Sequence, residues 1–455
     1  MLVEGRVYLS EALREQLGDD DSLQQLRDVA CLPGAFRQVI GLPDMHAGFG
    51  MPIGGVLATD AESGVVSAGA VGMDINCGVR LLTTDVEAAE LSVKTLRQLM
   101  LALEARIPTG VGKKSPLGEL RGSLAREVLT QGAQAVVAEG YGQASDLELT
   151  EENGVLPGAD PGALTKAALE RGGQLSTLGG GNHFLEFCFV QKVMDAEAAQ
   201  SFALRQGTLA ILIHSGSRGL GHQTCTDFSA MMLEAAPRYG LQLPNKGLAA
   251  VPIQSHEGQR YLAAMACAVN YAFANRQLMA HAVREVLREV LGIPSREVRQ
   301  AYDVAHNIAK FEEHFGQKVL VHRKGATRAL PPQHPSNPSQ YMKSGHPALL
   351  PGSMATGSYV VVGTPRLSET FFSVNHGAGR SMSRSHARKN ISEGELRDSL
   401  GATLVNARNL RSILDEAPAA YKDIDAVSAV LADIGLTRLV ARLKPLAVIK
   451  GEDDA

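Results

Sequence analysis

The sequence has few cysteines, no long apolar run and no strong excess of charge of either sign. Its cysteines are unclustered and odd in number: Cys31, Cys77, Cys188, Cys225 and Cys267. This usage argues against a disulfide framework and indicates reduced thiols. No stretch reaches the ~18 uncharged apolar residues that a membrane-spanning helix needs, and no basic-then-apolar leader opens the chain. We therefore expect a cytoplasmic protein that does not associate with membranes.

The net charge is also low, at −4, with a pI near 6.4. Such a chain has no global attraction to nucleic acid, so a polyanionic partner would have to be held by a local basic site. Glycine, in contrast, is abundant, with 47 residues of 455, and it gathers beside polar residues. This arrangement is expected where a backbone approaches a ligand closely.

The apolar pattern predicts a mixed α and β chain. The runs "TLAILIH" (208–214), "GSYVVVG" (357–363) and "ETFFSVNH" (369–376) are short and rich in β-branched or aromatic residues, which favours buried strands. Residues 257–292 keep a helical spacing for far longer than a strand, as one helix or two in series. The tail from about 395 to 443 is also expected to be mostly helical. We expect one intertwined domain.

Histidine recurs where apolar runs break into polar clusters. The segments are "GGGNHFLEF" (179–187), "ILIHSGSRGLGHQ" (211–223), "AYDVAHNIAK" (301–310) and "SVNHGAGRSMSR" (373–384). Loops fed by rigid strands concentrate binding groups, because the scaffold fixes their positions. These junctions are therefore candidate parts of one functional site.

A cysteine and an aspartate in "VSAGAVGMDINCGVRLL" (66–82) add two further metal-binding groups. Together with the junction histidines, the candidate ligands are Asp74, Cys77, His183, His214 and His306. Thiolate, imidazole and carboxylate suit Mn²⁺, Fe²⁺ or Zn²⁺, and one thiolate can bridge two ions in a two-metal site for phosphoryl transfer. A loop histidine is more often a plain hydrogen-bonding residue, so spacing alone leaves both interpretations open.

His376 stands in "NHGAGR", followed by Arg380 and Arg384. Such a loop can cradle phosphate through its backbone, and an imidazole there can act as a nucleophile that forms a phosphoramidate. An ordinary turn beside an exposed histidine is the alternative. "PGSMATGS" (351–358) is either a second anion-binding loop or a plain turn, and "VHRKGATR" (321–328) is either a solvated basic patch or a set of phosphate contacts.

Taken together, these motifs resemble the RtcB family of RNA-splicing ligases. The matching segments run in the family's order from about residue 37 to 451: "GLPDMHAGFGMPIGG", "VGMDINCGVRLL", "LGGGNHFLEF", "HSGSRGLGHQ", "DVAHNIAK", "VHRKGATRA", "PGSMATGSYVVVG", "HGAGRSMSRS" and "VARLKPLAVIKG". The resemblance implies an α/β (α+β complex) fold, with central β-sheets flanked by helices in a single compact domain spanning residues 1–455.

The family's activity is the joining of an RNA 3′-phosphate or 2′,3′-cyclic phosphate end to a 5′-hydroxyl end, in tRNA splicing or RNA repair. The implied cofactors are GTP and two Mn²⁺ ions. By motif, Asp74, Cys77 and His183 would hold one manganese and Cys77, His214 and His306 the other, while His376 would be the guanylated nucleophile. The implied guanylate pocket comprises Asn182, His183, Phe184, Leu185, Glu186, His306, Asn307, Pro351, Gly352, Ser353, Met354, Ser358, His376, Gly377, Ala378, Gly379 and Lys450.

Supporting roles and partners follow from the same resemblance. Arg218 and Arg380 are expected to contact phosphate, and His46 and His222 either support the site or are structural. The expected partners are RNA with the ends named above and an archease-type activator, and the protein is expected to be a monomer. Rival interpretations are a metal-dependent cyclic-phosphate hydrolase, a divergent paralogue with altered substrate, and a non-catalytic RNA-binding protein. Asn375 departs from the cysteine or serine usual before the nucleophile.

Overall fold

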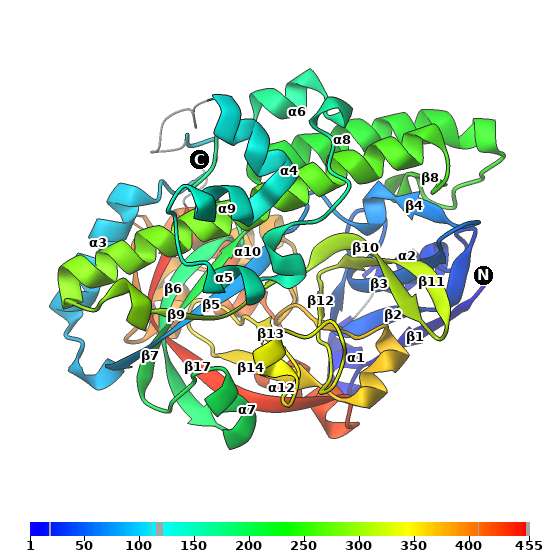
Figure 1. Cartoon of the computed structure of the whole chain (residues 1–455). Helices are drawn as coiled ribbons and strands as arrows, with labels where there is room; N and C mark the ends of the chain where they lie inside the picture. Colours follow the sequence, from blue (N-terminus) through cyan, green and yellow to red (C-terminus); the bar gives the residue numbers. More distant parts are fainter. Residues whose placement is uncertain (18–19, 111, 115–121, 408, 452–455) are drawn as a thin grey trace.

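Two β-sheets form the centre of the molecule, and helices lie around them (Figure 1). The computed structural model describes residues 1–17, 20–110, 112–114, 122–407 and 409–451. The smaller of the two central sheets has five strands, in the order β1 (Glu4–Val7), β2 (Ala35–His46), β3 (Ile53–Asp60), β11 (Gln317–Lys324) and β10 (Asn307–His314).

The larger sheet has eight strands and is antiparallel through its centre. Its order is β13 (Pro347–Leu350), β14 (Ser358–Gly363), β17 (Thr437–Lys450), β6 (Phe184–Val193), β7 (Thr208–Ser215), β5 (Gly78–Glu87) and β9 (Arg299–Ala305), with β16 (Leu404–Val405) beside β17. Two short pairs join β12 (Ala326–Arg328) to β15 (Ser373–Asn375) and β4 (Val65–Ser67) to β8 (Ala250–Pro252).

Helices cover both faces of the larger sheet. Their bounds are α1 (Glu11–Leu17), α2 (Ser22–Val29), α3 (Val93–Arg106), α4 (Gly122–Ala138), α5 (Ser145–Glu148), α6 (Lys166–Glu170), α7 (Ala196–Ser201), α8 (Arg218–Ala235), α9 (His256–Leu291), α10 (Arg384–Asn390), α11 (Glu393–Leu400) and α12 (Ile424–Asp433). Apolar side chains of α3 and α9 pack with β6 and β7 in one core, and α7, α10 and α11 pack in a core on the opposite face. The α/β class predicted from the sequence is confirmed.

Residues 256–291 form one continuous helix, α9, which settles the choice between one helix and two. The Ser255 hydroxyl accepts a hydrogen bond from the Gly258 N–H at 3.0 Å and caps the N-terminus. Gly292, at φ +72°, ends the helix in the left-handed conformation that glycine adopts without strain. None of the helices in the described part of the chain combines the length and apolar composition that crossing a bilayer requires.

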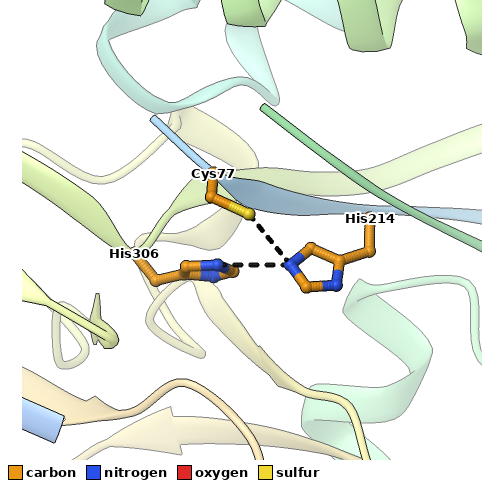
Figure 2. Close-up of side chains that lie close together, drawn as sticks. All are labelled: Cys77, His214 and His306. Atoms are coloured by element: carbon orange, nitrogen blue, oxygen red, sulfur yellow. Dashed lines mark hydrogen bonds between the residues drawn. The ribbon is translucent and has the colours of Figure 1, made fainter. Parts of the chain in front are cut away.

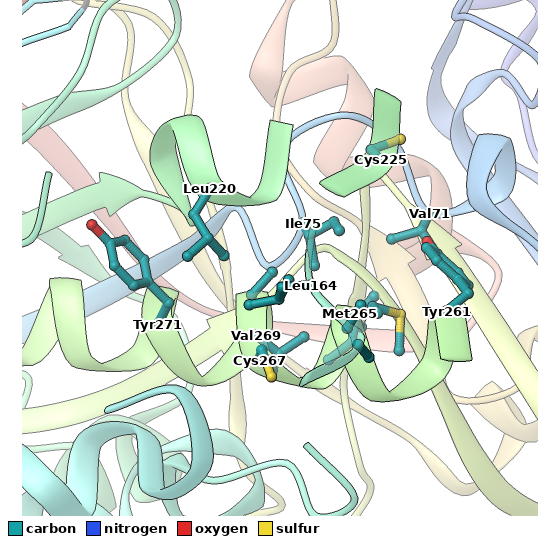
Figure 3. Packing of buried hydrophobic residues seen from close by; sticks show 14 of the residues in the cluster. Val71, Ile75, Leu164, Leu220, Cys225, Tyr261, Met265, Cys267, Val269 and Tyr271 are labelled. Carbon is teal, nitrogen blue, oxygen red and sulfur yellow. The ribbon is translucent and has the colours of Figure 1, made fainter. Parts of the chain in front are cut away.

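A third core lies between α8, α9 and the loop that follows β4 (Figure 3). Val71 and Ile75 come from that loop and are fully buried against Leu220 of α8 and Tyr261 and Met265 of α9. Burying one such aliphatic side chain contributes about 1.5–3 kcal/mol. Val71 and Ile75 therefore anchor the loop that carries Asp74 to the core beneath α8 and α9.

Two predictions of local structure were wrong. The tail is only partly helical, because the chain leaves α12 through Gly435, at φ +76°, and then forms the 14-residue strand β17 between β14 and β6. The apolar spacing of residues 437–450 fits a helix or a strand, and pairing with two neighbouring strands favours the strand. The expected strand 369–376 shrinks to Ser373–Asn375, because Phe371 and Phe372 adopt φ values of +53° and +50°.

Candidate metal centre and nucleotide pocket

The four strands β6, β7, β5 and β9 deliver the metal-ligand candidates to one edge of the larger sheet. Cys77 directly precedes β5 and His183 directly precedes β6, whereas His214 lies near the end of β7 and His306 directly follows β9. In antiparallel pairs, the start of one strand lies beside the end of its neighbour. The register agrees, since His214 is paired with both Phe184 and Val79. Residues far apart in sequence thus meet at one place.

Their donor atoms converge. The Cys77 Sγ lies 3.2 Å from the His214 Nε2, and the His214 and His306 Nε2 atoms are 3.2 Å apart (Figure 2). The Cys77 Sγ also lies 3.4 Å from the His183 Nε2. The Asp74 Oδ2 lies 2.7 Å from the His183 Nε2. These residues form two groups that could hold a metal ion, Asp74–Cys77–His183 and Cys77–His214–His306. The two groups share the Cys77 sulfur. The structure thus brings together all five ligand candidates.

A left-handed residue shapes the loop between Asp74 and Cys77. Asn76 adopts φ +52°, a conformation that asparagine tolerates better than most residues, and its side chain donates to the Val269 carbonyl at 2.8 Å. The Cys77 N–H donates to the Asp74 carbonyl at 2.9 Å, which closes a tight turn. The turn directs both side chains towards His183.

Arg276 of α9 holds the metal-ligand loops from behind. Its Nη1 donates to the carbonyls of Asn76 at 2.8 Å and Ser215 at 2.9 Å, so it fixes the neighbours of Cys77 and His214. The fully buried guanidinium is paired with Asp303 at 2.7 Å, and Arg80 pairs with the same carboxylate. Sequence reasoning missed Arg276 and Asp303, because a single arginine in a long helical pattern gives no sign of burial.

Burial sets the protonation of these groups. It lowers the pKa of His214 and His306 well below the usual range, which keeps both imidazoles neutral and able to bind metal. Burial also raises the pKa of the Cys77 thiol, and Asp74 adds to this effect. Burial opposes ionisation of Asp74, but His183 and Arg218 outweigh it and lower the pKa of Asp74 to about 2.

The donor set fits a divalent first-row ion. The Asp74 Oδ1 is buried without a hydrogen-bond partner among the described residues, although the carboxylate is ionised. A cation would supply the missing interaction, and it would also convert the shared thiol to the thiolate. Neutral imidazoles, one thiolate and one carboxylate are ligands that Mn²⁺, Fe²⁺ and Zn²⁺ accept.

A cavity of about 290 Å³ adjoins these groups. Most of the predicted guanylate-pocket residues line it: Asn182, Phe184, Glu186, Pro351, Gly352, Ser353, Met354, His376, Gly377, Ala378, Gly379 and Lys450. Burial raises the pKa of Glu186 well above its usual range, and Lys450 opposes this shift. The Lys450 ammonium lies 2.8 Å from the Glu416 carboxylate. The cavity thus combines the buried Glu186 carboxyl group with the paired charges of Lys450 and Glu416.

The other predicted pocket residues lie around this cavity. The Leu185 side chain points to the opposite face of β6, where it is buried in the core with α3 and α9. His306 and Asn307 line a neighbouring cavity of about 230 Å³. Ser358 supports the pocket loop, since its hydroxyl accepts a hydrogen bond from the Gly352 N–H at 3.2 Å. His183 faces Asp74 and Cys77.

His376 lines both cavities and is held by a carboxylate that sequence reasoning missed. The Asp44 Oδ2 lies 2.6 Å from the His376 Nδ1 and 3.0 Å from its backbone nitrogen. The rings of His376 and His306 lie 4.9 Å apart, centroid to centroid. Gly379, at φ +72°, passes so close that a Cβ there would lie 2.3 Å from the Asp44 carbonyl oxygen. Asp44 lies in the family-like motif "GLPDMHAGFG", but the sequence alone assigned it no role.

The segment "VHRKGATR" is not a solvated basic patch, and that interpretation was wrong. Arg323 is fully buried and paired with Glu312 at 2.5 Å, and Arg328 is paired with Glu152 at 2.9 Å. Of the segment's four basic or histidine side chains, Lys324 is the one that lines the 230 Å³ cavity beside His376. Arg323 and Arg328 neutralise carboxylates inside the protein, whereas the buried His322 lies beside the Ser67 N–H and the Leu57 carbonyl oxygen.

The remaining candidates divide between the site and the surface. Arg218 lies beside the metal ligands, with its Nη1 3.1 Å from the His183 Nδ1. Arg380 and Arg384 line the 290 Å³ cavity, which is the candidate nucleotide cavity, and pair with Glu416. His46 lines the same cavity, and burial lowers the pKa of its imidazole to about 4. His222 lies exposed on α8. Phosphate contacts by Arg218 and Arg380 stay predictions.

Comparisons with known proteins agree with this geometry. The family model described as tRNA-splicing ligase RtcB matches residues 25–451. The tRNA-splicing ligase RtcB of Thermococcus kodakarensis is 45% identical over 461 residues, covering 99% of this chain and 95% of the relative. The RNA-splicing ligase RtcB of Mycobacterium tuberculosis is 47% identical over 435 residues, covering 94% of this chain and 100% of the relative. The chain therefore belongs to the RtcB family of tRNA-splicing ligases.

Proposed function

We propose that this protein is an RNA ligase that joins RNA 3′-phosphate or 2′,3′-cyclic phosphate ends to 5′-hydroxyl ends through a guanylated histidine. GTP is the substrate that supplies the guanylate. The observation that carries the proposal is the position of His376, between the nucleotide cavity and the metal-ligand cluster, with its Nδ1 held by Asp44. Family membership supports the same activity.

Asp74, Cys77 and His183 would hold one Mn²⁺ ion, and Cys77, His214 and His306 a second. When bound, the ions would offset negative charge on the transferring phosphoryl group and lower the pKa of a nearby water or hydroxyl group. The donor chemistry also suits Zn²⁺, so the choice of Mn²⁺ rests on the family.

In the first step, the His376 Nε2 attacks the α-phosphorus of GTP, a P–N bond forms, and pyrophosphate leaves. Asp44 prepares this step, because a proton held at Nδ1 leaves the Nε2 lone pair free and the carboxylate stabilises the positive charge that develops on the ring. Lys450, Arg380 and Arg384 line the cavity where the negative charge of the nucleotide would lie.

In the second step, a 3′-phosphate oxygen of the RNA attacks the guanylate phosphorus, and the P–N bond to His376 breaks. A cyclic end is first opened by water. The 5′-hydroxyl then attacks the activated 3′-phosphate, the new phosphodiester forms, and GMP leaves. Lys324 lies in the cavity on the other side of His376, where it would neutralise the terminal phosphate.

Glu186 would select guanine. A guanine base presents N–H donors on one edge, and a carboxylate offers two acceptor oxygens for them. The Glu186 Oε1 is buried without a hydrogen-bond partner among the described residues, and the residue lines the nucleotide cavity. A ligand with paired N–H groups would satisfy it.

The testing experiment is covalent labelling with GTP that carries its radiolabel at the α-phosphate, in the presence of Mn²⁺. We expect label on the wild type and none on His376→Ala. Strand joining should disappear with the label, whereas a metal-dependent cyclic-phosphate hydrolase would open cyclic ends without His376. Absence of label on the metal-loaded wild type would reject the ligase proposal. RNA is the proposed partner, and an archease-type activator is proposed on the family resemblance alone.

A further inference from the structure

Phe49 places an aromatic ring in solvent at the cavity beside His376. The side chain lies in the loop between β2 and β3, and 62% of the residue is exposed. It lines the 230 Å³ cavity together with Lys324, Asn182 and His376. A single exposed apolar residue is common on protein surfaces. The location of Phe49, at a cavity that contains the candidate nucleophile, singles it out.

The backbone that carries this ring is held on both sides. The Lys324 ammonium donates a hydrogen bond to the Phe49 carbonyl and a second one to the Gly69 carbonyl, at 3.0 Å. Gly50, which follows, adopts φ +80° and packs so closely that a Cβ there would lie 2.3 Å from the Gly247 carbonyl oxygen. The backbone that presents the exposed ring is therefore fixed at Phe49 and Gly50.

Lys324 also indicates what the cavity receives. Its ammonium is buried, with the residue only 6% exposed, and among the described residues its hydrogen-bond partners are carbonyl oxygens and not carboxylates. A buried cation without a counter-ion is costly unless an anion joins it. An anion between Lys324 and His376 would lie within the cavity that Phe49 also lines.

We propose that the Phe49 ring stacks on the base of the 3′-terminal nucleotide of the RNA strand that carries the 3′-phosphate. This inference rests on the proposed function. With the terminal phosphate in the cavity, the attached nucleoside lies at the rim, where an exposed aromatic face is available. Stacking on an aromatic side chain is tolerant of sequence, because every base presents a π-face. It therefore suits an enzyme that accepts different RNA ends.

The experiment compares two single-stranded oligoribonucleotides that both end in a 3′-phosphate. One has a normal terminal nucleotide, and the other lacks only the terminal base. Their equilibrium affinities are measured by fluorescence anisotropy for the full-length wild type and for Phe49→Ala, Phe49→Trp and Phe311→Ala. Phe311 is a matched control, because it is also an exposed phenylalanine but lines a different cavity.

We expect Phe49→Ala to weaken binding of the normal strand about tenfold, in the range measured for loss of one base–aromatic stack. Phe49→Ala should not change binding of the strand that lacks the base, and Phe49→Trp should bind the normal strand as tightly as the wild type. Phe311→Ala should bind both strands as the wild type does. Thermal unfolding of Phe49→Ala confirms that the variant is folded.

Two results would overturn the inference: equal affinity of Phe49→Ala and wild type for the normal strand, or an equal loss of affinity for both strands. These measurements contain no GTP. Failure of the proposed function is detected separately, as absence of guanylate label on wild-type His376 without RNA, so the two failures are distinguishable.

Discussion

One carboxylate oxygen of Asp44 contacts His376 twice, at 3.0 Å from the backbone nitrogen and at 2.6 Å from Nδ1. The first contact fixes the chain at His376, and the second fixes the tautomer of its ring. Asp44 itself is fully buried at the end of β2, which belongs to the five-stranded sheet. The proposed nucleophile is therefore held from one sheet, while the candidate metal ligands come from the other.

Asp44→Asn should slow guanylation of His376 by about 100-fold, because the amide keeps a polar side chain but removes the charge that stabilises the ring as the P–N bond forms. The rate of label transfer from GTP measures this step without RNA. Asp85→Asn is the control, since Asp85 pairs with Arg299 at the surface. An unchanged rate in Asp44→Asn would show that the contact serves only the fold.

Arg276→Met should lower both stability and metal affinity. Removing one partner of a buried ion pair costs about 3–5 kcal/mol, and loosening the groups that orient metal ligands costs about 10–100-fold in affinity. Arg284→Met is the matched control, because Arg284 is also buried on α9 but pairs with Asp146 at 2.6 Å. Urea unfolding and Mn²⁺ titration separate the two effects. Equal loss of Mn²⁺ affinity in both variants would contradict a positioning role for Arg276.

The sequence identified the metal-ligand candidates more completely than the residues that support them. The ligand candidates are aspartate, cysteine and histidine side chains in short polar clusters beside apolar runs, and such a pattern is local information. Arg276 and Asp44 act through residues more than a hundred positions away in sequence, such as Asn76 and His376. No local pattern contains such a contact. Strand β17 was missed for the same reason, since two partner strands decide its structure.

Glu186→Gln should stabilise the protein at neutral pH and weaken GTP binding. Burial raises the pKa of Glu186 in the folded state above its ordinary value of 4.5. The contribution of Glu186 to the free energy of unfolding is therefore most favourable below pH 4.5, and it is lost as the pH rises through the folded-state pKa. Glutamine does not titrate. The free energy of unfolding of Glu186→Gln should therefore exceed that of the wild type at pH 8, and the difference should shrink towards pH 4.

Glu416→Gln is a control for which we expect a stability change in the opposite direction. Burial opposes ionisation of Glu416, but Lys450 and Arg384 outweigh it and lower its pKa to about 2. The contribution of Glu416 to the free energy of unfolding is present at pH values above its ordinary pKa, and it is lost as the pH falls through the folded-state pKa. Glu416→Gln should therefore destabilise the protein at pH 8. If both variants shift stability in the same direction between pH 4 and pH 8, the assignment of charge in the cavity is wrong.

Cys77→Ala should bind neither of the two proposed manganese ions, whereas His306→Ala should still bind one. The reason is geometric, because the Cys77 sulfur belongs to both candidate ligand groups and His306 to only one. Equilibrium dialysis against Mn²⁺ followed by metal analysis gives the number of ions per chain. Cys188→Ala is the control, since Cys188 is buried in the core of the larger sheet. If Cys77→Ala and His306→Ala each lose a single ion, the thiolate does not bridge two metals, and strand joining must be explained with separate sites.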